Sequence, residues 1–235
     1  MNNNTIQLKI KQRLNKLDSQ DYDNIQCWQI VEAFNKAQIE WVRRQLDGKN
    51  QRNTGDEQSR RRIDDLQNLL VPDTTMSLTK FNIFYQSDTL PDNYLEYKRI
   101  DVLVNKECCP DNQPMVVYLA EEDNRAQLLR DEHKKPSYEW RETFATLIDN
   151  KARIFTNGDF EISKGFFTYY RKPINIEILG CSDPYTGNIT AVDVECEFKD
   201  DIVELLVDET VSILGGDIES PNQYGRGLEQ AERNN

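Results

Sequence analysis

The sequence has little of what the common classes of enzyme require. It contains one histidine in 235 residues, His133, which lies in the charged run Arg-Asp-Glu-His-Lys-Lys-Pro. A Ser-His or Cys-His pair would have to use that imidazole, and no nucleophile motif surrounds any serine or cysteine. The favoured interpretation of His133 is a solvated loop residue, with a general base or a metal ligand as the alternative.

Phosphate-binding glycine loops are missing as well. The pair Gly215-Gly216 follows a predicted helix instead of opening one, so it cannot present the N-terminal amides that bind anions. We therefore predict no cofactor-binding residue and no catalytic residue.

An acidic cluster is the nearest approach to a metal site. Glu121, Glu122 and Asp123 are consecutive, and carboxylates bind hard metal ions. Acids also favour the first turn of a helix because they complement its dipole, and that interpretation is preferred, so we predict no metal-binding residue. A hydrolase that uses Glu121, Glu122 or His133 is the enzymatic alternative to a protein without enzymatic activity.

Long hydrophobic runs and an excess of positive charge are both absent. No apolar stretch approaches the roughly 20 residues that span a bilayer. The first residues, Met-Asn-Asn-Asn-Thr, lack the charged and apolar regions of a signal peptide. The formal net charge of −12 disfavours free nucleic acid and anionic membranes as partners of the whole protein. These features predict a soluble protein in the cytoplasm of the cell that makes it.

Cysteine is present but without a recognisable pattern. The number is odd and no C-x-x-C spacing occurs, so we expect neither a disulfide framework nor a zinc site. Free thiols in a reducing compartment are the preferred interpretation. The five residues are Cys27, Cys108, Cys109, Cys181 and Cys196.

Hydrophobic periodicity divides the chain into four regions and predicts an α+β fold. Residues 1–72 have helical spacing and should form an N-terminal helical hairpin or bundle. Residues 73–199 are rich in strand-like runs and should form a mostly antiparallel β-sheet. A C-terminal helix, 200–215, is expected to pack on the core, and 216–235 should be an extended or disordered tail because its apolar content is low.

The clearest local signal is a hairpin centred on Asn157-Gly158. Runs rich in β-branched and aromatic residues flank this pair, and Asn-Gly readily adopts the positive φ angles of a type I′ turn. The predicted strands are 152–156 and 159–171. Gly165 interrupts the second strand, where it indicates a bulge.

Basic residues gather around the connection between the second and third predicted helices. Two interpretations remain: a docking surface for an acidic partner or passing DNA backbone, or a solvated tip. The residues are Arg43, Arg44, Lys49, Arg52, Arg60, Arg61 and Arg62.

Acidic residues follow one side of the last helix. Asp201, Glu204 and Asp208 are spaced so that their like charges repel. Basic residues of a neighbouring subunit would relieve this repulsion, whereas a stripe facing water would need no partner.

The tail carries isolated anchor residues. Tyr224 and Arg226 belong to the types that dominate interface energies. We expect the tail to be mobile in the free subunit and ordered against a neighbour in an assembly.

Four short motifs stand in a suggestive order along the chain. They are Leu-Pro-Asp-Asn-Tyr-Leu at 90–95, Tyr-Tyr-Arg-Lys-Pro at 169–173, Asp-Ile-Val-Glu at 201–204 and Ile-Glu-Ser-Pro-Asn-Gln-Tyr at 218–224. Together they resemble virion structural proteins of short-tailed phages, in particular the head-to-tail connector (ring or adaptor) proteins near the portal in crAss-like phages. The resemblance covers roughly residues 60–230.

That resemblance implies a structural subunit without enzymatic activity. It implies a homo-oligomeric ring in the virion neck, of twelve copies to match a portal, assembled in the host cytoplasm. The expected partners are the portal protein and neighbouring tail or ring proteins, with non-specific contact to DNA in the lumen and none to membrane. The alternative is a soluble binding module for an acidic protein partner, with Arg60, Arg61 and Arg62 as its contact residues.

Overall fold

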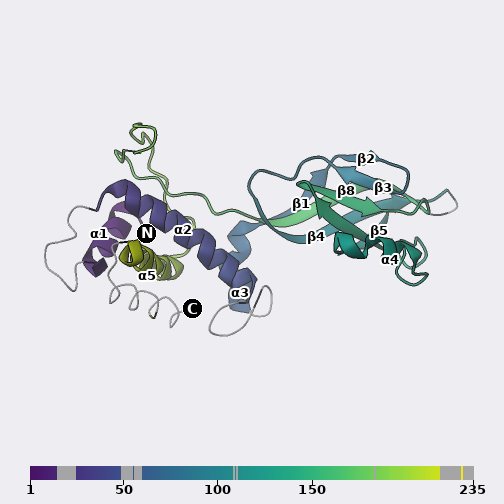
Figure 1. The fold of residues 1–235 in the computed structure, drawn as a ribbon, viewed down its shortest axis with the longest axis horizontal. Helices are drawn as coiled ribbons and strands as arrows, with labels where there is room; N and C mark the ends of the chain where they lie inside the picture. Colours follow the sequence, from purple (N-terminus) through teal and green to yellow (C-terminus); the bar gives the residue numbers. More distant parts are fainter. Residues whose placement is uncertain are drawn as a thin grey trace. The chain divides into compact units, whose positions relative to one another are not determined.

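The structure, a computed structural model, describes residues 1–14, 25–48, 55, 60–107, 109, 111–182, 184–217 and 229. The predicted α+β class is confirmed: helices accompany a mostly antiparallel, curled sheet of eight strands (Figure 1). The chain forms two compact units. We call the first, residues 1–68 with 173–235, the helical unit, and the second, 69–172, the β unit.

The helical unit contains residues from both ends of the chain. The side chains of Arg60, Arg62 and Asp217 lie outside the described part. Its helices are α1 (Asn3–Leu14), α2 (Cys27–Leu46), α3 (Arg60–Leu66) and α5 (Asp200–Asp217), and the 3-10 turn η1 (Gln67–Leu69) leads out of it.

The C-terminal helix α5 organises this unit. It packs against α2 and α1, and its buried side chains include Ile202, Val203, Leu206 and Val207. The sequence indicated helices at both ends of the chain but not that they pack on one another. Their apolar stripes form one core separate from the β unit, and α1 contacts α2 far less than it contacts α5.

Local signals define the ends of α1 and α2. Asn2 Oδ1 accepts the Thr5 backbone N–H at 2.8 Å, which caps the N-terminus of α1. Gly48 has φ 71° just after α2, the left-handed conformation that commonly follows the end of a helix. The short helix α3 buries Leu66, whereas its Ile63 side chain is 49% exposed.

The β unit is one eight-stranded sheet. Its order is β1-β8-β4-β5-β6-β7-β3-β2, and every neighbouring pair is antiparallel except β5–β6. The strands are β1 (Leu70–Met76), β2 (Leu78–Lys80), β3 (Phe84–Ser87), β4 (Tyr94–Asn105), β5 (Gln113–Leu119), β6 (Glu142–Ile148), β7 (Lys151–Phe155) and β8 (Glu161–Arg171), with η2 (Glu122–Asn124) and α4 (Arg125–Arg130) between β5 and β6.

The predicted hairpin is wrong in its pairing but right in its turn. Asn157 and Gly158 have φ 49° and 75°, and the Asp159 N–H donates to the Thr156 carbonyl at 3.0 Å. However, β7 pairs with β3 and β6, whereas β8 pairs with β1 and β4. Strands from both halves of the curled sheet share one core, to which Ile154 and Ile162 both contribute. The turn therefore sends the chain from one half of the sheet to the other.

The predicted bulge lies two residues before Gly165. Leu103 pairs with Lys164 and Val104 with Ile162, so Ser163 is the extra residue in β8. Gly165 has a different role: a Cβ there would lie 2.9 Å from Leu78 Cδ1. Because glycine has no Cβ, the Leu78 side chain can pack directly against this position.

Residues 174–198, which we call the arm, belong to the helical unit. The arm falls within the region 73–199 that was predicted to be β-rich, but its described residues form no regular strand, and the β-bridges among them are the isolated pairs Glu177–Val194 and Ser182–Ile189. The arm is therefore an irregular antiparallel ribbon (green in Figure 1) whose conformation depends on contacts with α1 and α2.

Candidate interaction site

The inner side of the arm is packed on the helices. Ile176, Ile178 and Cys196 are buried, and the Phe198 ring meets Trp41 of α2 edge to face, with 5.4 Å between centroids. Burial raises the pKa of the Cys196 thiol to about 11, so this residue stays protonated at neutral pH and is a poor nucleophile. The inner side therefore holds the arm in place by apolar contact.

Side-chain amides replace the hydrogen bonds of a regular sheet. Asn35 of α2 pairs with both backbone groups of Ile176: its Oδ1 accepts the N–H at 2.8 Å and its Nδ2 donates to the carbonyl at 3.3 Å. On α1, Asn3 Nδ2 lies 2.9 Å from the carbonyls of Glu177 and Val194. These amides satisfy buried backbone groups of the arm, which would otherwise destabilise the fold.

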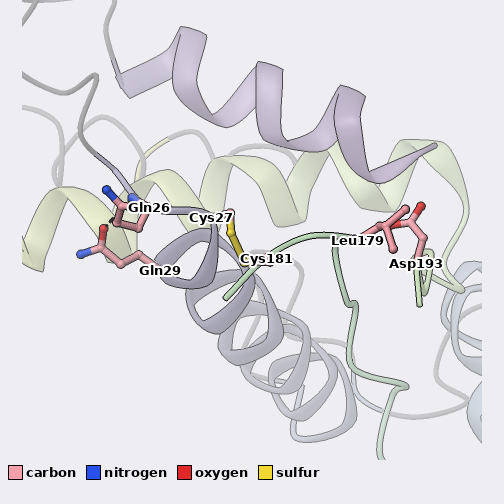
Figure 2. Close-up of a disulfide and its surroundings, with 6 residues drawn as sticks. All are labelled: Gln26, Cys27, Gln29, Leu179, Cys181 and Asp193. Carbon is pink, nitrogen blue, oxygen red and sulfur yellow. Dashed lines mark hydrogen bonds between the residues drawn. A yellow bond between two sulfur atoms is a disulfide. The ribbon is translucent and has the colours of Figure 1, made fainter. Parts of the chain in front are cut away.

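A disulfide fixes the arm to the start of α2. Cys27 and Cys181 are bonded (Figure 2), and their Cα atoms lie 5.8 Å apart. The expectation that all five cysteines are free thiols is wrong for this pair. The two residues are 154 positions apart in sequence, and only the return of the arm onto α2 brings them together, so local spacing gave no signal.

The arm also leaves large hydrophobic side chains exposed. Five large hydrophobic side chains are more than half exposed: Ile174, Leu179, Tyr185, Ile189 and Val192. Exposed single hydrophobic residues are common, but a group along one segment marks an interaction surface. Because the arm is held by a disulfide and by buried amides, it presents these side chains at defined positions.

A groove of about 540 Å³ lies between the arm and the first turns of α2. Trp28 and Val31 form part of its wall on α2, and Ile189 and Val192 form part of its wall on the arm. The charged residues among the described residues lining it, Glu32 and Glu177, are both acidic. The groove therefore suits an occupant that is apolar and basic.

The predicted acidic stripe on α5 finds partners within the chain. Glu204 pairs with Lys9 and Arg13 of α1, and Arg13 Nη1 also lies 2.5 Å from Asp208 Oδ1. Both proposed explanations fail for these two acids, since neither a neighbouring subunit nor bulk water is needed to balance them. Asp201 alone of the three is exposed.

The predicted basic tip is partly engaged inside the helical unit. Arg44 pairs with Glu209 of α5 at 2.6 Å, and Glu209 is buried. Burial raises the pKa of Glu209, and the guanidinium of Arg44 opposes that shift. Arg61 lies 3.6 Å from Asp65, and Arg43 is exposed in the last turn of α2.

Several predicted residues lie outside what the structure describes. The structure gives no placement for Lys49, Arg52, Tyr224 or Arg226, nor for the side chains of Arg60 and Arg62. Their predicted contacts stay predictions.

The residues of the enzymatic alternative come together only in part. Glu121 and His133 line the same cleft in the β unit, of about 670 Å³, together with Glu142. Glu142 accepts a hydrogen bond from the Tyr118 hydroxyl at 3.3 Å, and Glu122 instead pairs with Arg125 at 2.5 Å. Within the described residues, no hydrogen bond joins the His133 ring to a carboxylate, so the cleft shows no acid–base pair.

The described part of the chain has neither a cluster of metal-ligating side chains nor a helix with the length and hydrophobicity of a membrane span. Over the described residues, no group of three or more His, Cys, Asp or Glu side chains is placed to hold a metal ion. In the same part of the chain, no helix is long and apolar enough to cross a membrane.

Comparison with known proteins identifies no relative. No family model matches the chain, and no curated protein matches it significantly. The resemblance to phage connector proteins therefore stays a prediction from the sequence motifs.

Proposed function

We propose that the protein is a structural subunit that assembles through the arm, and that its assembly is a ring in the portal-proximal connector of a phage. The observation that carries the proposal is the row of exposed hydrophobic side chains on a segment fixed by the Cys27–Cys181 disulfide. A segment that is rigid and apolar loses little conformational entropy on binding, which favours stable association.

The motif resemblance supplies the class of assembly. Connector proteins form closed rings, and a ring requires a surface of each copy to meet a different surface of the next. An arm with exposed hydrophobic side chains is suited to such a contact. The alternative, a binding module for an acidic partner, does not account for the exposed hydrophobic side chains of the arm, and one described arginine, Arg44, already pairs with Glu209 of the same chain.

Size-exclusion chromatography with light scattering tests this proposal. The wild-type protein should form a ring-sized species, alone or with its cognate portal protein. The double substitution Ile189→Ser/Val192→Ser should abolish or weaken that species without lowering the melting temperature, because both side chains are largely exposed.

A matched control separates the arm from general surface hydrophobicity. Val116→Ser/Leu119→Ser changes two similarly exposed side chains of the β unit and should leave assembly unchanged. A wild-type protein that remains monomeric and does not bind the portal would contradict the proposal, as would equal assembly of the arm variant and wild type.

A further inference from the structure

The groove beside the arm combines apolar walls with negative charge. Glu32 and Glu177 line it, and Glu195 is a further exposed acid on the arm. Neither Glu177 nor Glu195 forms a side-chain ion pair within the described residues. An occupant that supplies arginine side chains and an aliphatic group would complement this surface in both respects.

The other end of α2 has that composition. Arg43 is exposed in its last turn, and Arg61 and Ile63 are partly exposed on α3. The chain returns to α2 shortly before α3, since a Cβ on Gly55 would lie 3.1 Å from the Leu46 carbonyl. We call Arg43, Arg61 and Ile63 the basic end.

We propose that the acidic groove of one copy binds the basic end of a second copy of this chain. The inference rests on the proposed function and names the contact that builds the assembly. Ile63 would extend the apolar contact with Ile189 and Val192, while Arg43 and Arg61 would face Glu177 and Glu195. Burying these charged side chains is favourable only when each one pairs with a side chain of opposite charge.

The two surfaces are too far apart to meet within one copy. Trp28 in the groove and Arg43 are separated by fifteen residues of a continuous helix, which is about 22 Å at 1.5 Å per residue. A contact between two different surfaces repeats from copy to copy, and it produces a ring when the rotation closes. The geometry within the helical unit is therefore that of a head-to-tail subunit.

Charge reversal in two separate variants tests the contact. The first variant, Glu177→Arg/Glu195→Arg, makes the arm basic, and the second, Arg43→Glu/Arg61→Glu, makes the other end acidic. Each variant alone should lose self-assembly, because every contact then joins like charges. An equal mixture should regain self-assembly when the two variants alternate. The basic arm of the first variant then meets the acidic end of the second, and the acidic arm of the second meets the basic end of the first.

The control is the substitution Glu107→Arg/Glu132→Arg, which changes the net charge as the first variant does but at exposed positions of the β unit. It should assemble as wild type does. Mass photometry counts the copies in each sample, with portal protein present if wild type requires it, and circular dichroism confirms that each variant is folded.

The possible results separate this inference from the proposed function. The contact is supported if each variant alone fails to assemble and the mixture of the two variants assembles. If wild type assembles and the mixture does not recover, or if the variants assemble normally, the groove–basic end contact is wrong while the structural function stands. If wild type assembles neither alone nor on the portal, the proposed function is wrong and the inference with it.

Discussion

Breaking the Cys27–Cys181 disulfide should destabilise the helical unit by about 4 kcal/mol. The bond closes a loop with a sequence separation of 154, and the chain-entropy treatment gives about 5 kcal/mol for a loop of that length. The β unit lies inside the loop and holds its own ends together, because Leu70 pairs with Tyr170. If the β unit stays folded while the helical unit unfolds, roughly 50 free residues remain in the loop, and the effect falls to about 4 kcal/mol.

Urea denaturation of Cys27→Ser/Cys181→Ser measures this change. With a denaturant slope of about 2 kcal/mol/M, the midpoint of the helical unit should fall by about 2 M. Reduction should lower the midpoint of the wild type by a similar amount and leave the variant unchanged. The control is Cys109→Ser, which removes a half-buried thiol that is not part of this disulfide.

Two results would refute the reasoning. One is a midpoint that neither reduction nor substitution alters. The other is the failure of mass spectrometry to find a Cys27–Cys181 peptide in digests of the non-reduced protein. A shift seen also in the Cys109 variant would show that the effect does not come from this bond.

Three further predictions concern single contacts. Arg44→Ala should cost about 3 kcal/mol in urea unfolding because it leaves the buried Glu209 carboxylate unpaired, and an added Glu209→Gln should recover most of that loss. Because the pKa of Glu209 is raised in the folded state, the protonated carboxyl contributes stability that is fully present below the unfolded pKa and is lost as pH rises through the folded pKa. The Arg44 variant should therefore regain stability in acid. A loss of stability that does not change with pH would argue against the pair. Gly158→Val, at φ 75°, should cost about 1–2 kcal/mol in thermal unfolding, and an unchanged melting temperature would contradict the turn. Asn35→Leu should cost about 1–3 kcal/mol because two backbone groups of Ile176 lose their partner; a stability equal to that of wild type would show that water replaces the amide.

The sequence predicted those features of the fold that depend on neighbouring residues. The period of the apolar residues predicted helices at both ends of the chain and strands between them. Helices α1, α2 and α5 and the eight-stranded sheet lie in those regions. The Asn157-Gly158 turn was predicted for the same reason, since its φ angles are a property of two residues.

Features that depend on distant contacts could not be predicted. The partners of β7 and β8 follow from how the sheet curls around its core, which no local pattern encodes. The site was missed for a similar reason: nothing in the sequence near Asn3 and Asn35 indicates their role, because their partners are backbone groups of the distant arm. A signal did exist in the apolar residues of the arm, but these residues were assigned with the rest of 73–199 to the predicted sheet.

The insertion of the β unit into the helical unit makes the chain modular. Leu70 and Tyr170 are register partners on adjacent antiparallel strands, so the unit leaves and rejoins the rest of the chain at nearly one point. Register partners in antiparallel strands lie about 5 Å apart, a gap that one or two residues span. Residues 69–172 can therefore be regarded as a cassette. Evolution or an engineer could delete it, or exchange it for another domain with adjacent termini, and the three packed helices, the arm and its disulfide would keep every contact described between them.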